Sequence, residues 1–180
     1  MIKITYFVHG TTIDNEQGKA TGWLGGELSQ LGLKQARDLG PMVASQQFDA
    51  VFCSDLKRAV DSAKLGFADK YEIIEDKRLR ECNYGDFNGQ PEEFKEHKMQ
   101  SFVSQPFPGG ESYQDVEKRM ADFLEFLKNN YDGQHIAIVA HQAPQLALEV
   151  LLKGKTWQQA IAQDWRNVKA WQSGWEYEVN

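Results

Sequence analysis

Short runs of β-branched and aromatic residues alternate along the chain with segments in which apolar residues recur every three or four positions. The runs predict strands and the longer period predicts helices. The expected strands are 2–8, 48–54, 71–76, 135–141 and a last strand or hairpin over 169–179. The expected helices are 29–40, 55–67, 112–127, 144–153, 156–165 and a charged piece near 91–104. Because strands and helices alternate, the pattern predicts an α/β fold, a three-layer αβα sandwich around a mainly parallel sheet.

Local signals place several of the helix ends. Ser29, Asp55 and Ser112 precede apolar helical faces, so each is expected to act as an N-cap. Gly40-Pro41 is expected to end the first long helix. Five glycines between residues 10 and 27 predict a long loop after the first strand.

Composition and charge then narrow the class of protein. The 180 residues suggest one domain, 1–180, and a net charge of −6 with no basic cluster argues against nucleic acid as a partner. No stretch approaches the roughly 20 apolar residues of a membrane span, and the first strand does not read as a signal peptide. Cys53 and Cys82 suggest buried thiols in a reducing compartment, so a cytoplasmic location is expected.

Three chemically active residues follow three of the predicted strands. His9 ends the first strand, Arg58 follows the second at the start of a helix, and His141 ends the late strand. In a parallel sheet these carboxyl ends meet at one edge, where ligands bind. One imidazole can attack phosphorus while an arginine and a second imidazole neutralise the phosphoryl oxygens. The sequence therefore indicates a phosphoryl site.

Each of these residues also has an ordinary structural interpretation. A single histidine at a strand end is usually packed and hydrogen-bonded, and a single helical arginine is usually solvated. A two-histidine metal site is a further alternative, but His9 and His141 lack the short HxxxH-type spacing of ligand pairs, so no metal is expected. The convergence of all three at one sheet edge favours the phosphoryl site.

Motifs along nearly the whole chain, in the expected order, carry a family resemblance. His9 to Asn15 reads HGTTIDN and is similar to H-G-x-T-x-x-N. The other matching segments are QGKATGW (17–23), GELSQLGLKQA (26–36), CSDLKRAVDSA (53–63), LRECNYGDFNG (79–89) and PGGES (108–112). Together they resemble the phosphoglycerate mutase-like branch of the histidine phosphatase superfamily.

The resemblance implies a role for each matching residue. His9 would be the nucleophile that forms a phosphohistidine, Arg58 and His141 would bind the phosphoryl oxygens, and Glu81 would be the general acid and base. Asn15 would contact phosphate or orient the substrate. Further substrate contacts are expected from residues near these motifs: Thr11, Thr12, Lys19 and Gln142. No cofactor is implied.

Two positions depart from the family pattern. Val8 stands where the family has the arginine of Arg-His-Gly, and Gln142 follows the second histidine where glycine is usual. Losing one such phosphate contact would cost roughly 10²–10³ in rate. Three outcomes remain open: a slow or altered phosphatase, a substitute contact from Lys19, Thr11 or Gln142, or a site that binds a phospho-ligand without turning it over.

The expected activity is metal-independent hydrolysis of a small phosphomonoester. A mutase is the less favoured enzyme class, because it must shield its phosphohistidine from water and the small cap expected at about 82–111 is short for that task. Phe87, Phe94, Phe102 and Phe107 either line a leaving-group pocket or form the cap core. The tryptophans 157, 165, 171 and 175 either pack the C-terminal helices or support a homodimer.

Overall fold

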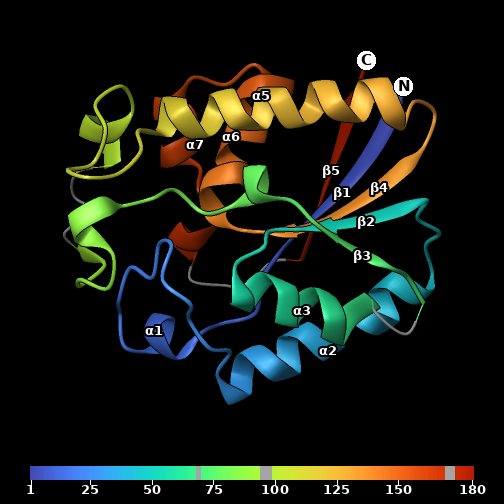
Figure 1. The fold of residues 1–180 in the computed structure, drawn as a ribbon, viewed down its shortest axis with the longest axis horizontal. Coiled ribbons are helices and arrows are strands. Elements are labelled where there is room, and N and C mark those ends of the chain that lie inside the picture. The colour runs from blue at the N-terminus through green and yellow to red at the C-terminus, as the bar shows by residue number, and fades with distance from the viewer. Residues whose placement is uncertain (68–69, 94–98, 169–172) are drawn as a thin grey trace.

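A central sheet of mainly parallel strands organises the computed structural model, which describes residues 1–67, 70–93, 99–168 and 173–180 (Figure 1). The strands in sheet order are β3 (Ile73–Glu75), β2 (Ala50–Cys53), β4 (His135–Ala140), β1 (Ile2–Val8) and β5 (Ser173–Val179). The first four are parallel, and β5 pairs antiparallel with β1 at the edge. The predicted α/β class is confirmed.

Helices cover both faces of this sheet. Helices α2 (Gln30–Ala44) and α3 (Lys57–Phe67) lie on one face, and α5 (Tyr113–Asn130) and α6 (Gln142–Lys153) lie on the other. The shorter elements are α1 (Ile13–Glu16), α7 (Trp157–Ala162) and the 3₁₀ turns η1 (Lys77–Leu79), η2 (Gly85–Phe87), η3 (Met99–Phe102) and η4 (Trp165–Val168). The arrangement is the expected three-layer sandwich.

The residues of strand β1 are apolar on both faces of the sheet because each face packs against its own layer of helices. Ile4, Tyr6 and Val8 belong to the core beneath α5 and α6, whereas Phe7 belongs to the core beneath α2 and α3. Successive side chains of a strand point to opposite faces, and here each face is covered by helices. A continuous apolar run therefore fits this central position.

The structure corrects three of the expected boundaries. Helix α2 continues through Pro41 to Ala44, because Val43 still packs in the core and the proline costs only one hydrogen bond near the helix end. Asp55 does not cap α3, since its carboxylate pairs with Arg80 at 2.6 Å. Helix α1 interrupts the loop expected over 10–27.

Other predictions hold with smaller shifts. Ser29 and Ser112 cap α2 and α5 as expected, and α6 begins two residues early because Pro144 sits in its first turn, where no N–H bond is needed. Within the helical piece expected near 91–104, Pro91 forms an isolated bridge with Lys19 and η3 covers Met99–Phe102. Residues 94–98 lie outside the described residues, as do 169–172. None of the described helices could cross a membrane.

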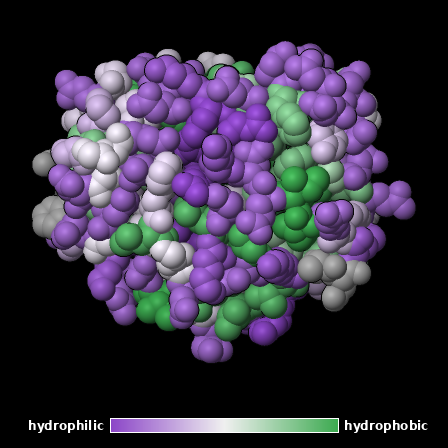
Figure 2. Space-filling model, in the orientation of Figure 1, coloured by the Kyte–Doolittle hydropathy of each residue, from purple (hydrophilic) through white to green (hydrophobic). Residues whose placement is uncertain are grey.

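The molecular surface and the C-terminal tryptophans are relevant to whether the protein forms a homodimer. Figure 2 shows a face that is mostly hydrophilic, with hydrophobic residues scattered across it. Trp157 is buried and its Nε1 donates to Glu117, and the rings of Trp165 and Trp175 lie 5.8 Å apart. Trp157 therefore packs against α5, and Trp165 and Trp175 pack against each other, while Trp171 lies outside the described residues.

Candidate active site

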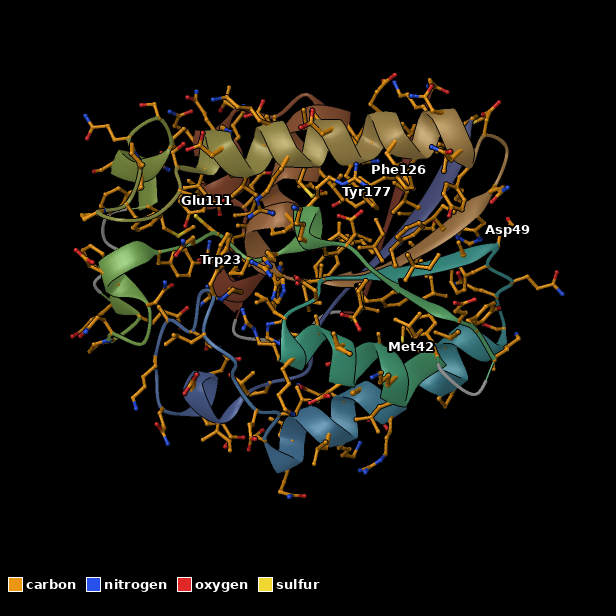
Figure 3. All side chains as sticks on the ribbon, viewed as in Figure 1. Trp23, Met42, Asp49, Glu111, Phe126 and Tyr177 are labelled. Carbon is orange, nitrogen blue, oxygen red and sulfur yellow. The ribbon has the colours of Figure 1, made fainter. Side chains whose placement is uncertain are left out.

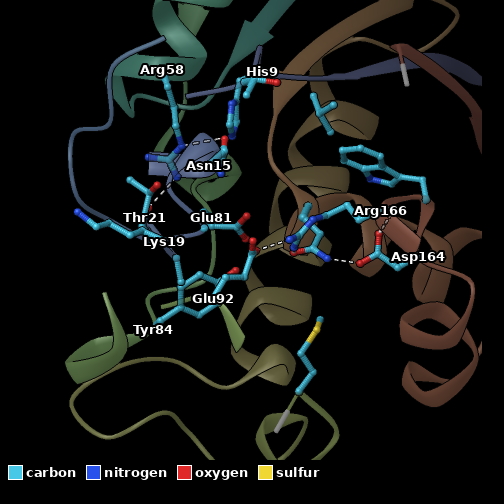
Figure 4. Close-up of a pocket in the computed structure, with 18 of the residues that line it drawn as sticks. His9, Asn15, Lys19, Thr21, Arg58, Glu81, Tyr84, Glu92, Asp164 and Arg166 are labelled. Atoms are coloured by element: carbon cyan, nitrogen blue, oxygen red, sulfur yellow. Dashed lines mark hydrogen bonds and ion pairs between the residues drawn. The ribbon is translucent and has the colours of Figure 1, made fainter. Parts of the chain in front are cut away.

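A cavity of about 900 Å³ opens beyond the carboxyl ends of β1, β2 and β4 (Figure 4). Figure 3 shows Trp23 and Glu111 on this side of the view, opposite Asp49, which precedes β2. Eight positions considered for the site from the sequence line the cavity, namely Val8, His9, Thr11, Asn15, Lys19, Arg58, Glu81 and Gln142, whereas His141 does not. The three strand ends thus deliver their residues to one edge, as the topology rule predicts.

His9 is held as a neutral imidazole with one nitrogen facing the arginine. Its Nδ1 lies 2.7 Å from the carbonyl oxygen of Gly10, and its Nε2 accepts from Nε of Arg58 at 3.3 Å. Burial and the Arg58 cation lower the pKa of His9 to about 3. A proton on Nδ1 satisfies both contacts, so Nε2 carries the lone pair that a nucleophile needs.

The backbone of Gly10 holds the end of β1, and with it His9, in place. The N–H of Gly10 donates to Oγ of Ser62 at 3.0 Å, which ties the strand end to α3. A Cβ at Gly10 would lie 2.3 Å from the carbonyl oxygen of Gly32 in α2. Only glycine permits this approach between strand end and helix.

Arg58 is a buried cation whose hydrogen bonds go to uncharged partners. It is 2% exposed, and its Nη1 and Nη2 donate to the carbonyl oxygens of Leu24 and Gly22 at 3.0 and 2.7 Å. Burial lowers its pKa, with Glu81 acting in the opposite direction. Among the described residues no carboxylate pairs with it directly. A buried cation of this kind favours an anionic ligand.

His141 lies behind His9 and is sealed from solvent. The two ring centroids are 5.0 Å apart, and His141 is 0% exposed. Neither ring nitrogen has a hydrogen-bond partner among the described residues, while the backbone of His141 is fixed by the Tyr6 hydroxyl. Burial, Arg58 and His9 lower the pKa of His141 well below its usual value. Two buried nitrogens without partners are costly, so this ring is suited to a partner that arrives with a ligand.

Glu81 is oriented by backbone groups on both sides of the cavity. Its Oε1 accepts from the N–H of Cys82 at 2.8 Å and of Ala143 at 3.1 Å. Its own carbonyl accepts from Nε1 of Trp23 at 2.7 Å and from Arg119 at 3.0 Å. Because both backbone bonds use Oε1, Oε2 is the oxygen suited to carry a proton toward the cavity.

The polar residues in and around α1 differ in whether they can contact a ligand in the cavity. Thr12 is fully buried and forms a capping box with Asn15, so its hydroxyl holds the helix and does not line the cavity. Asn15 and Lys19 are exposed at the cavity, and the N–H of Thr11 is occupied by Gln35. The predicted contact from Thr12 is therefore not supported by the geometry.

Gln142 belongs to a polar network that the sequence analysis missed. Its Nε2 donates to Asp164, and its Oε1 accepts from Nη1 of Arg166 at 2.7 Å. Nη2 of Arg166 in turn donates to Glu92. Burial acts to lower the pKa of Arg166, but Glu92 and Asp164 together raise it. No sequence pattern around Arg166 distinguishes it from a surface arginine.

The remaining described histidine and the two thiols do not line the cavity. Nε2 of His135 lies 2.8 Å from the Thr5 hydroxyl, at the far end of the sheet, and His97 is outside the described residues. Cys53 and Cys82 are buried, as expected, and are not joined by a disulfide. Within residues 1–67, 70–93, 99–168 and 173–180, no three or more His, Cys, Asp or Glu side chains gather as they would around a metal ion.

Comparison with known proteins matches most of the chain to one family. The sequence profile of the histidine phosphatase superfamily (branch 1) matches residues 6–169. Phosphoserine phosphatase 1 of Hydrogenobacter thermophilus is 31% identical over 163 residues, which are 86% of this chain and 77% of that protein. A 2,3-bisphosphoglycerate-dependent phosphoglycerate mutase of Methylorubrum populi is 31% identical over 164 residues, 82% of this chain and 77% of the mutase.

A solved structure agrees with the fold. The mycobacterial glucosyl-3-phosphoglycerate phosphatase in complex with VO3 is 27% identical, with a TM-score of 0.79, and the match covers 89% of this chain and 86% of that one. The relatives thus include phosphatases and mutases on one architecture.

Proposed function

Because the chain belongs to the histidine phosphatase superfamily (branch 1), we propose that it is a phosphomonoesterase that works through a phosphohistidine on His9. The observation that carries the proposal is the meeting of neutral His9, buried Arg58 and backbone-anchored Glu81 in one cavity. Its substrate is a small phosphorylated metabolite.

The first half-reaction transfers the phosphoryl group to the protein. Nε2 of His9 attacks phosphorus while the bond to the leaving oxygen breaks, and Glu81 donates its proton to that oxygen. The Arg58 cation offsets the negative charge on the phosphoryl oxygens. The Gly10 carbonyl, at 2.7 Å from Nδ1, stabilises the positive charge that develops on the His9 ring.

The second half-reaction releases phosphate. The Glu81 carboxylate takes a proton from water as that water attacks the phosphohistidine, and the P–N bond breaks to return neutral His9 and protonated Glu81. We assign His141 to the phosphoryl oxygens as a neutral N–H donor. Its position 5.0 Å from His9 and its two ring nitrogens without partners support that role.

Hydrolysis of an aryl phosphate in the presence of a chelator tests the proposal, over about pH 5 to 8. We expect wild type to turn over and His9→Ala to be inactive. His135→Gln is the matched control, because His135 lies at the opposite end of β4 and should keep wild-type turnover. Turnover that survives in His9→Ala, or that needs added metal, contradicts the proposal.

A mutase is the second candidate function, and the phosphoglycerate mutases among the relatives favour it. Asn15 and Lys19 are exposed at the cavity, so water can reach a phosphohistidine there, which supports hydrolysis. Appearance of free phosphate without any transfer to a second phosphoglycerate distinguishes the two. A site that binds without turnover, because Val8 replaces arginine, is the remaining alternative.

Several wider features of the chain belong to the same proposal. We propose one catalytic domain over 1–180 with a small cap at about 82–111, acting in the cytoplasm without nucleic acid as a partner. Within that cap Phe102 and Phe107 stack at 3.9 Å, which supports a packed cap core. A homodimer stays a prediction that light scattering checks.

A further inference from the structure

The indole of Trp23 holds the backbone of the proposed general acid from outside the cavity. Its Nε1 donates to the carbonyl oxygen of Glu81 at 2.7 Å, although 58 positions separate the two residues. Glu81 lies between η1 and η2, outside the helices and strands, so tertiary contacts such as this one fix its position. Trp23, labelled in Figure 3, is 36% exposed and does not line the cavity. It can therefore act on the reaction only through other residues.

The loop that carries Trp23 is also fixed on the nucleophile side of the site. Arg58 donates to the carbonyl oxygens of Gly22 and Leu24, the two neighbours of Trp23, at 2.7 and 3.0 Å. Two backbone carbonyls thus bind the proposed phosphate-binding cation, while the indole between them binds the residue that carries the proposed proton donor, Glu81. The loop therefore connects the two halves of the site.

A second contact orients the indole ring. The guanidinium carbon of Arg80 lies 4.7 Å from the centroid of the Trp23 ring, within the range of a cation–π contact. Nε and Nη2 of Arg80 each donate to the Asp55 carboxylate, at 2.7 and 2.6 Å. Such a two-point pair holds the plane of the guanidinium. The indole that stacks on it is thereby aimed at the Glu81 carbonyl.

The Glu81 carbonyl also accepts from Nη2 of Arg119 at 3.0 Å. That guanidinium is shared with the Glu111 carboxylate, and its Nη1 donates to the carbonyl of Arg78 at 2.6 Å. Arg119 is therefore not able to follow the Glu81 backbone if the bond from Trp23 is lost. The indole N–H thus makes its own contribution to the position of Glu81.

We propose that Trp23 is a positioning residue, which sets the Glu81 carboxyl where it can protonate the leaving oxygen of a substrate phosphorylating His9. This inference rests on the proposed function. A proton donor must lie within hydrogen-bond reach of the oxygen that it protonates, and a displacement of about 1 Å can cost about 10²-fold in rate. Loss of the indole N–H should therefore matter most for leaving groups that need a proton.

Phenyl phosphate and 4-nitrophenyl phosphate are matched probes, because they differ by one nitro group and phenolate is much the poorer leaving group without a proton. Trp23→Phe removes the N–H and keeps an aromatic ring for Arg80. We expect kcat/KM to fall about tenfold for phenyl phosphate and less than about threefold for 4-nitrophenyl phosphate. In the Glu81→Gln protein, Trp23→Phe should add little, because the proton donor that it positions is already absent.

Trp157→Phe is the matched control, since it removes another indole N–H bond, to Glu117 at 2.6 Å, from a tryptophan that does not line the cavity. It should leave the ratio of the two kcat/KM values unchanged, because a loss of folded protein affects both substrates equally. If wild type is active, an unchanged ratio in Trp23→Phe, or its full effect persisting in the Glu81→Gln protein, overturns this inference alone. A wild type that hydrolyses neither phosphate overturns the proposed function, and this inference with it.

Discussion

The guanidinium of Arg58 donates from Nε to Nε2 of His9 at 3.3 Å, while its two terminal nitrogens hold the carbonyl oxygens of the loop that contains Gly22 and Leu24. One buried side chain therefore positions the proposed nucleophile and fixes the loop next to it, and its charge adds to the burial that lowers the pKa of His9. A substrate phosphoryl that reaches His9 meets this cation at once.

Arg58→Lys should remove most of the activity although it keeps the charge. Lysine has no planar fork, so it cannot hold both loop carbonyls and contact His9 together. We expect kcat/KM for an aryl phosphate to fall by roughly 10²–10³. Arg37→Lys, at an exposed position of α2, is the matched control. If both variants retain wild-type kcat/KM, Arg58 does not act in the site.

The low pKa values of His9 and His141 should make the protein less stable in acid. Below about pH 6.5 the unfolded chain binds protons at both histidines, whereas folded His9 stays neutral until about pH 3. The free energy of unfolding should therefore fall as pH drops from 6.5, by at most about 1.4 kcal/mol per pH unit for each histidine.

Urea unfolding of wild type and His9→Gln across this range measures that slope. The variant lacks the contribution of His9, so it should lose less stability than wild type between neutral pH and about pH 4. Parallel curves for the two proteins would show that His9 titrates in the folded state as it does in the unfolded chain.

Val8→Arg should raise turnover and lower stability. Val8 lines the cavity but is 3% exposed and packs in the core, so an added guanidinium gains a phosphoryl contact while overfilling the core by about 1–3 kcal/mol. We expect kcat for an aryl phosphate to rise by up to roughly 10²–10³. Val8→Leu enlarges the side chain without charge and is the control. A Val8→Arg protein no faster than Val8→Leu would mean that the missing arginine costs nothing here.

Glu81→Gln should reveal a general acid through its dependence on the leaving group. An alkyl oxygen leaves only when protonated, whereas a nitrophenolate leaves readily without a proton. Loss of the proton donor should thus lower kcat/KM by roughly 10²–10⁴ for an alkyl phosphate and far less for nitrophenyl phosphate. An equal loss with both substrates would assign Glu81 a positioning role through its contacts with Cys82 and Ala143.

The sequence predicts the sheet edge of the site well, because that part depends on topology. Once strands 2–8, 48–54 and 135–141 are parallel, His9, Arg58 and His141 must come to one end of the sheet. The capping residues Ser29 and Ser112 follow from local hydrogen bonding and are likewise confirmed. Pro41 was misplaced as a helix end because core packing of Val43 outweighs one lost hydrogen bond.

The polar network of Glu92, Gln142, Asp164 and Arg166 could not be predicted, because it depends on contacts between residues that are distant in the sequence. Glu92 and Arg166 are 74 positions apart and share no motif. The role of Asp55 could not be predicted for the same reason. Its carboxylate could either cap a helix or pair with Arg80, and only the folded structure shows that it pairs with Arg80. The complete burial of His141 also depends on tertiary packing around the end of β4, which the sequence pattern does not reveal.

Trapping of the covalent intermediate tests the central claim most directly. Wild type mixed with substrate and quenched within one turnover should carry an acid-labile phosphoryl group on the peptide that contains His9, as found by mass spectrometry under alkaline conditions. His9→Gln should carry none, and His135→Gln should match wild type. Phosphate release with no phosphoryl group on His9, or with one at another residue, would contradict the phosphohistidine account.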